Sequence, residues 1–268
     1  MTGVPLVVFS DLDGILLDHA TYTWAQAKPA LQRLARINAP VVLASSKTAA
    51  EIEVLQHDMG LSYWPAIVEN GAGVLGGEAP ARYSDLRAVI DKVPARLRSC
   101  FKGFGDMTVA EVTGCTGLPP EEAQRAKQRV FSEPGLWVGN HADELAFLHA
   151  LAQYGVTVRT GGRFMTLSFG ATKADQMAAI LARFVPRHSV ALGDAPNDVE
   201  MLETAECGII VANPYRASLP PLAGEANGKI CRTSEAGPTG WNNAIMALLD
   251  RLGLPSSAPL TSGLQNHE

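Results

Sequence analysis

The sequence predicts an α/β fold, with a Rossmann-like parallel-sheet core that is interrupted by an inserted α+β module. Short, continuous apolar runs alternate along the chain with segments of helical periodicity. Each run ends in a polar cluster, and the middle of the chain departs from this pattern. Apolar runs without polar alternation are typical of strands buried on both faces of a parallel sheet. Strands that alternate with helices imply right-handed βαβ crossovers.

The composition fits such a fold and excludes several other classes. The chain has 268 residues, of which 47% are hydrophobic and 18% charged, so it is not disordered, collagen-like or a coiled coil. Its net charge of −5 argues against nucleic-acid partners and anionic membrane surfaces. We find neither an apolar run of the ~20 residues needed to span a membrane nor a signal-peptide pattern. We therefore expect a cytoplasmic protein with four reduced cysteines, and the sequence does not predict its oligomeric state.

The strands and helices of the core follow from the positions of the apolar runs. Strands are predicted at 6–10, 40–44, 66–68, 189–192 and 207–212, and helices at 24–37, 52–59, 174–185 and 199–205. Ligands of open α/β sheets bind at the carboxyl ends of the strands. Eight polar residues are therefore expected to meet at one edge of the sheet: Asp11, Asp13, Ser45, Lys47, Glu69, Asn70, Asp194 and Asp198.

The middle of the chain predicts a module of its own. Glycines at 71, 73, 76 and 77 are expected to interrupt the regular elements. After them, helices are predicted at 86–101, 120–130 and 142–154 and strands at 108–112, 136–138 and 156–159. Residues 164–169 alternate between apolar and polar, as in a half-exposed antiparallel strand. The predicted division is a core of residues 1–82 and 168–254, an inserted module of residues 83–167, and a flexible tail of residues 255–268.

Two carboxylates follow the first predicted strand. Asp11 and Asp13 are two positions apart in the segment FSDLDG, a spacing at which their side chains can face the same way. One can act as a nucleophile and the other as a proton donor, and together they can bind a hard cation such as Mg²⁺. The alternative is an ordinary solvated loop after a strand.

Two more carboxylates follow the fourth predicted strand. Asp194 and Asp198 are four positions apart across the start of a helix, and Pro196 suits the first helical turn. Simple N-capping by Asp194 is the alternative, but it leaves Asp198 without a role. Four carboxylates at neighbouring strand ends repel one another unless a cation lies between them. This favours a Mg²⁺ site.

Two further residues are suited to an anionic substrate. Lys173 lies at the predicted start of a helix, and Ser45 ends the second predicted strand. A lysine and a hydroxyl flanked by backbone amides can together hold a phosphoryl group. The alternatives are a solvated surface lysine and a serine that caps a helix.

In chain order, these four segments resemble the motifs of the haloacid dehalogenase superfamily of phosphohydrolases. The resemblance covers the whole chain except its tail. It implies the core fold of that superfamily, and it equates the inserted module with the larger, C2-type cap. It also implies a hydrolase of phosphoric monoesters.

The same resemblance implies roles for the individual residues. Asp11 attacks phosphorus and forms an aspartyl phosphate, while Asp13 protonates the leaving oxygen and then helps a water molecule to attack. Ser45 and Lys173 hold the transferring phosphoryl group, and alignment and charge neutralisation are what this reaction chiefly needs. The implied Mg²⁺ ligands are Asp11, the backbone carbonyl of Asp13, and Asp194, with Asp198 close behind.

A narrower resemblance is to the mannosyl-3-phosphoglycerate phosphatase family. It is carried by the segments SSKT at 45–48, ENGA at 69–72, FSEP at 131–134 and GGRF at 161–164, with Tyr22, Trp24 and Glu51. It implies a small phosphorylated sugar acid as substrate, with mannosylglycerate and phosphate as products. The candidates for binding the organic part are Lys47, Asn70, Arg163 and Asn197. Arg163 has the bidentate fork that suits a carboxylate, although it can equally be a solvated charge, and Asn197 can also orient the lysine or the acids.

One position departs from the pattern. Ile15 stands where the first motif usually has threonine, so a hydroxyl that can steady the aspartate loop is absent. This departure leaves a catalytically weak, binding-only homologue open. A broader sugar-phosphate phosphatase also stays open, as does a phospho-acceptor signalling domain, although the chain is long for a domain of that kind.

Overall fold

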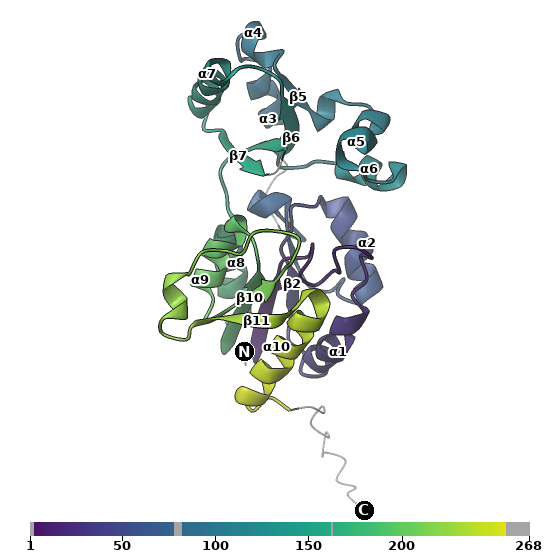
Figure 1. Ribbon diagram of the computed structural model, residues 1–268, viewed down its shortest axis with the longest axis vertical. Helices are drawn as coiled ribbons and strands as arrows, with labels where there is room; N and C mark the ends of the chain where they lie inside the picture. Colours follow the sequence, from purple (N-terminus) through teal and green to yellow (C-terminus); the bar gives the residue numbers. More distant parts are fainter. Residues whose placement is uncertain (1–2, 78–81, 162, 256–268) are drawn as a thin grey trace, which may run out of the picture. The chain divides into compact units, whose positions relative to one another are not determined.

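The computed structural model describes residues 3–77, 82–161 and 163–255 (Figure 1). The chain divides into two compact units, the first comprising residues 1–42 and 181–268 and the second residues 43–180. In the part of the chain that is described, no helix has the length and apolar character needed to cross a membrane. The predicted tail lies outside the described residues from position 256 onward.

The first unit carries the parallel sheet, with the strand order β11-β10-β9-β1-β2. β9 pairs in parallel with both β1 and β10, and β10 pairs in parallel with β11. All five residues of β1 are buried, as expected of a strand that is covered on both faces. The predicted α/β fold with a parallel-sheet core is confirmed. The strands are β1 (Leu6–Ser10), β2 (Val41–Leu43), β9 (His188–Gly193), β10 (Cys207–Ala212) and β11 (Ile230–Ala236).

Helices cover this sheet. α9 packs against β9 and β10, whereas α10 packs against β10, β11 and α1, so that they flank the sheet from opposite sides (Figure 1). Strand β11 and helix α10 were not among the predicted elements. The bounds are α1 (Lys28–Arg36), α8 (Lys173–Phe184, which crosses the boundary between the units), α9 (Val199–Thr204) and α10 (Gly237–Arg251).

The second unit begins with a helix and a hairpin. Helix α2 (Ala49–Met59) starts at a capping box in which Thr48 and Glu51 exchange hydrogen bonds. Strand β3 (Ala66–Val68) pairs antiparallel with β4 (Gly73–Leu75), and a parallel bridge joins Ala44 to Ile67. The glycines expected to interrupt the chain here flank this short strand, since Gly73 begins β4 and Gly76 directly follows it.

A four-stranded antiparallel sheet with the order β5-β6-β8-β7 follows. Helices α3, α4 and α7 bury apolar side chains against it, and β8 shows the predicted antiparallel pairing. The boundaries of the inserted module at 83 and 167 stay a prediction. The elements are α3 (Tyr83–Ile90), α4 (Ala95–Arg98), β5 (Phe101–Gly103), α5 (Val109–Thr116), α6 (Pro120–Ala126), β6 (Glu133–Trp137), α7 (His141–Ala152), β7 (Thr157–Gly161) and β8 (Phe164–Ser168).

Two predictions for this region are wrong. The expected strand at 108–112 is the start of helix α5, because Thr108 and Glu111 form a capping box. The expected helix at 86–101 is two helices, because Pro94 fixes its backbone at the N-cap of α4 and cannot continue α3. Its last predicted residue, Phe101, begins strand β5.

Candidate active site

Asp11 directly follows β1, at the carboxyl edge of the sheet. Its backbone N–H donates to the carbonyl of Leu192 on β9 at 2.9 Å, so the parallel pairing continues into the loop. The hydroxyl of Ser10 donates to the Asp11 carbonyl at 2.7 Å and accepts from the indole N–H of buried Trp241 at 2.9 Å. The backbone of Asp11 is thus fixed where the strand order reverses, the usual ligand site of such sheets.

The loop after Asp11 turns tightly. Gly14 has φ +77°, and a Cβ there would lie 2.4 Å from the side-chain nitrogen of Asn213, so only glycine fits. Ile15 is fully buried, and its backbone N–H donates to the Leu12 carbonyl at 3.1 Å. The loop is therefore steadied by apolar packing and a backbone hydrogen bond at the position where threonine is usual. Asp13 is half-buried in this loop and forms a backbone bridge with Leu17.

Asp194 and Asp198 lie together at the end of β9, and both are buried. The Asp198 carboxylate accepts hydrogen bonds from the backbone N–H groups of Asp194 and Ala195, both at 3.1 Å. The second carboxylate, Asp198, which capping by Asp194 would leave without a role, thus accepts two backbone N–H groups of this loop. Gly193 is required here because a Cβ would lie 2.5 Å from the Cβ of Asp198.

The Asp194 carboxylate has two side-chain neighbours from the loop after β10. Asn213 donates to one of its oxygens at 2.6 Å, and the Arg216 guanidinium lies 3.4 Å from the other. These residues also line a small cavity of about 100 Å³ beside Asp194. Sequence reasoning missed both residues, although the Asn213-Pro214 pair at the end of a predicted strand was a signal for the first.

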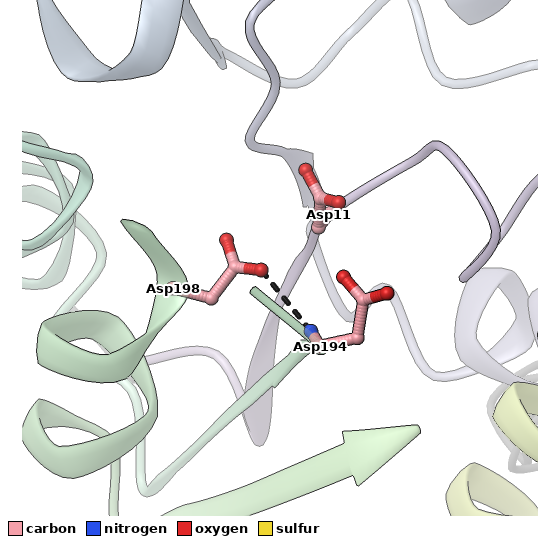
Figure 2. Close-up of side chains that lie close together, drawn as sticks. All are labelled: Asp11, Asp194 and Asp198. Atoms are coloured by element: carbon pink, nitrogen blue, oxygen red, sulfur yellow. Dashed lines mark hydrogen bonds between the residues drawn. The ribbon is translucent and has the colours of Figure 1, made fainter. Parts of the chain in front are cut away.

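Three carboxylates converge in the first unit. Asp11, Asp194 and Asp198 each offer an oxygen within 4.8 Å of the others (Figure 2). Three ionised carboxylates this close, two of them buried, repel one another unless a cation compensates their charge. Oxygen ligands are those that Mg²⁺ prefers, so this donor set fits the predicted ion. Asp13 is not among the three carboxylates of this group, and its predicted part as a ligand through its backbone carbonyl stays a prediction.

The second unit positions Ser45. It is buried, its backbone N–H donates to the Ile67 carbonyl at 2.9 Å, and its hydroxyl accepts from the backbone N–H of Lys47 at 3.3 Å. Its carbonyl accepts from the backbone N–H of Asn70 at 2.9 Å. The second unit thus brings together Ser45, Lys47 and Asn70. Since the carboxylates belong to the first unit, the predicted meeting of all eight polar residues stays a prediction.

Lys173 is the first residue of α8 and is only 1% exposed. Thr172 and Asp175 exchange hydrogen bonds at this helix start, at 2.9 and 3.1 Å. Lysines are rarely so buried, because an ammonium group must be compensated when it leaves water. The burial thus argues against the alternative of a solvated surface lysine.

Two predicted substrate residues have more exposed positions. Arg163 lies in the turn between β7 and β8, with its guanidinium 5.9 Å from the Phe164 ring centre. Asn197 is exposed in the short helical turn between Asp194 and Asp198. Neither position tests the predicted substrate contacts.

Comparison with known proteins independently indicates the family of this chain. A family model described as haloacid dehalogenase-like hydrolase matches residues 8–87 and 147–217. A glucosyl-3-phosphoglycerate/mannosyl-3-phosphoglycerate phosphatase of Persephonella marina is 30% identical over 92% of this chain and 98% of its own length.

Solved structures agree on the fold. A phosphatase of the haloalkanoate enzyme superfamily from Bacteroides thetaiotaomicron has a TM-score of 0.66 at 18% identity, over 95% of this chain and 97% of its own. The sucrose-phosphatase of Synechocystis has a TM-score of 0.57 at 15% identity, over 92% and 98%. At these identities the likeness supports the fold alone.

Proposed function

Since the chain belongs to the haloacid dehalogenase-like hydrolase family, we propose that it is a Mg²⁺-dependent phosphatase that hydrolyses mannosyl-3-phosphoglycerate to mannosylglycerate and phosphate. The observation that carries the reaction is the convergence of Asp11, Asp194 and Asp198 at the carboxyl edge of the sheet. The substrate rests on the Persephonella relative, which is similar over nearly its whole length. The predicted location in the cytoplasm stays a prediction.

Asp11 is the proposed nucleophile. Its carboxylate attacks phosphorus, a bond forms between a carboxylate oxygen and phosphorus, and the bond from phosphorus to the glycerate oxygen breaks. Asp13 gives a proton to that leaving oxygen. Asp13 then takes a proton from water as the water attacks the aspartyl phosphate, which releases phosphate and restores Asp11.

The other predicted residues hold the reacting group. Ser45 and Lys173 bind the phosphoryl oxygens, so the charge of the transition state is met by positive charge and by a hydroxyl donor. Asp11, Asp194 and Asp198, with the backbone carbonyl of Asp13, would hold Mg²⁺. When bound, this ion neutralises charge on the phosphoryl oxygens.

The organic part of the substrate is assigned to Lys47, Asn70, Arg163 and Asn197. Arg163 is proposed for the glycerate carboxylate, because its guanidinium can bind both oxygens at once. The name of the Persephonella relative covers glucosyl as well as mannosyl substrates. A phosphatase that accepts both sugars, or other sugar phosphates, is therefore the second candidate function.

A substrate panel tests the proposal. Phosphate release is measured with Mg²⁺ on mannosyl- and glucosyl-3-phosphoglycerate, mannose 6-phosphate and 3-phosphoglycerate, and kcat/KM is compared. We expect mannosyl-3-phosphoglycerate to lead by at least tenfold. Equal values for the two glycosyl esters favour the broader phosphatase, and no release from any of the four esters contradicts the proposal.

A further inference from the structure

The turn Glu69–Gly71 has an unusual backbone. Its three residues have φ angles of +51°, +59° and +92°, in the left-handed region. Glycine enters this region freely and asparagine at modest cost, but glutamate rarely does. A glutamate held there must gain compensating contacts elsewhere, and backbone strain of this kind is often found at functional sites.

The compensation comes from the Glu69 carboxylate. It is fully buried and accepts hydrogen bonds from the backbone N–H groups of Val130, Phe131 and Ser132 at 2.9, 3.2 and 2.7 Å. The Ser132 hydroxyl donates a fourth, at 2.7 Å. The segment 130–132 lies about 60 residues further along the chain, in the predicted inserted module. Its three successive backbone N–H groups thus form an anion-binding site for the Glu69 carboxylate.

One side of the turn holds the loop of Ser45. The Glu69 backbone N–H donates to the Lys47 carbonyl, and that of Asn70 donates to the Ser45 carbonyl, both at 2.9 Å. Arg129, which directly precedes the segment 130–132, also contacts this loop, because its guanidinium donates to the Ser46 carbonyl at 3.0 Å. The conformation of the Ser45 loop therefore depends on the turn Glu69–Gly71 and on the segment that binds the Glu69 carboxylate.

The other side of the turn lies against the start of α8. A Cβ on Gly71 would lie 2.1 to 2.4 Å from backbone atoms of Thr172 and Lys173, so the two backbones touch. The Gln176 side-chain amide donates to the Gly71 carbonyl at 2.9 Å. The turn is thus packed between the backbones of Ser45 and Lys173.

We propose that Glu69 is a positioning residue, which sets Ser45 and Lys173 on the phosphoryl group through the left-handed turn that its carboxylate locks. This inference rests on the proposed function, since it concerns the two residues assigned to that group. It also gives the segment 130–132 a part in phosphoryl binding that its place in the sequence does not indicate. Glu69 itself touches no reacting atom.

The test compares Glu69→Gln with Glu111→Gln. Glu111 is a matched control, because its carboxylate also accepts a backbone N–H, that of Thr108 at 2.8 Å, but at the start of α5. The readouts are kcat and KM for p-nitrophenyl phosphate, the Kd for inorganic phosphate with Mg²⁺ by calorimetry, and the melting temperature. This small ester isolates phosphoryl binding from recognition of the sugar acid.

For Glu69→Gln, we expect kcat/KM for the ester to fall at least tenfold and the Kd for inorganic phosphate to rise at least tenfold. For Glu111→Gln, we expect a lower melting temperature with both constants unchanged. A folded Glu69→Gln protein with both constants within twofold of the wild type overturns the inference and leaves the proposed function intact. A wild type that neither cleaves the ester nor binds phosphate overturns both the inference and the proposed function.

If Glu69→Gln does not fold, Ser132→Ala serves as the test variant, since it removes one hydrogen-bond donor to Glu69 and keeps the charge of the carboxylate. A Kd raised threefold or more supports the inference, and an unchanged Kd overturns it.

Discussion

The carboxylate of Asp198 reaches back to the backbone of Asp194, with its Oδ2 atom 3.1 Å from that nitrogen. It is fully buried, and the same oxygen also accepts the N–H of Ala195. One side chain therefore shapes the loop that presents Asp194 and adds a third negative charge beside Asp11. A residue with both tasks is suited to the edge of a metal site, where neighbours of the ligands orient them.

Asp198→Asn separates these two tasks. Asparagine keeps an oxygen that can accept the backbone N–H groups, but it removes the charge. We expect the Mg²⁺ concentration for half-maximal phosphate release to rise by about 10- to 100-fold, the usual effect of changes around metal ligands. Mg²⁺ titrations of both proteins measure it. An unchanged midpoint in a folded variant argues against Asp198 as part of the ion site.

Asn213→Ala tests a residue that only the structure identifies. The variant loses the donor that lies 2.6 Å from Asp194, so this carboxylate is less firmly oriented. We expect about a tenfold loss of apparent Mg²⁺ affinity, again as for the removal of a neighbour of a ligand. The control is Asn227→Ala, which alters an exposed loop of the same unit. Equal Mg²⁺ midpoints in the two variants would contradict this role.

Ile15→Thr restores the side chain that is usual at this position. Because Ile15 is fully buried, the change removes apolar packing and buries a hydroxyl. We expect the free energy of unfolding to fall by about 1–3 kcal/mol, and kcat not to rise, since a backbone hydrogen bond already steadies the loop. Urea unfolding and steady-state kinetics measure the two quantities. A large gain in kcat would show that the enzyme is weakened by its isoleucine.

The second unit should lose stability in acid through Asp106. Burial alone would raise the pKa of its carboxyl, but hydrogen bonds from Arg87, Arg98 and the Gly103 backbone outweigh this and lower the pKa to about 2. Since the folded pKa lies below the unfolded value of about 3.9, the contribution is complete above pH ~4 and is lost as the pH falls toward 2.

Asp106→Asn tests this directly. We expect the variant to unfold about 1 kcal/mol more easily at pH 6, a value reduced from that of a fully buried charged pair because the Asp106 side chain is 23% exposed. The difference should shrink as the pH is lowered below 4. Urea unfolding at pH 6, 4 and 3 measures it, and a difference that does not depend on pH would contradict the assignment.

The elements that the sequence predicts well are those decided by local pattern. Strand β1 is fully buried and therefore continuously apolar, and the antiparallel strand β8 alternates as a half-exposed strand should. The prediction of a strand at 108–112 is wrong. Valine and threonine favour strands, but Thr108 and Glu111 also form a capping box, which starts a helix. Local rules compete there, and the helix start was the stronger one.

The site, too, has residues that the sequence predicts and residues that only the structure identifies. The candidate carboxylates follow apolar strands, and strand ends of a parallel sheet meet at one edge, so Asp11 and Asp194 could be predicted as a pair. Asn213 and Arg216 come from a loop whose path is set by tertiary packing. The hydrogen bonds of the Glu69 carboxylate join it to residues some 60 positions further along the chain, and no local pattern in the sequence indicates them.

Phosphate release by the wild type and by Asp11→Asn, on mannosyl-3-phosphoglycerate with Mg²⁺, tests the central claim most directly. We predict turnover by the wild type, loss of that turnover when a chelator removes Mg²⁺, and at least a thousandfold loss of kcat in the folded variant, because an amide cannot form the aspartyl phosphate. Turnover by Asp11→Asn at the wild-type rate would contradict the assignment of Asp11 as the nucleophile.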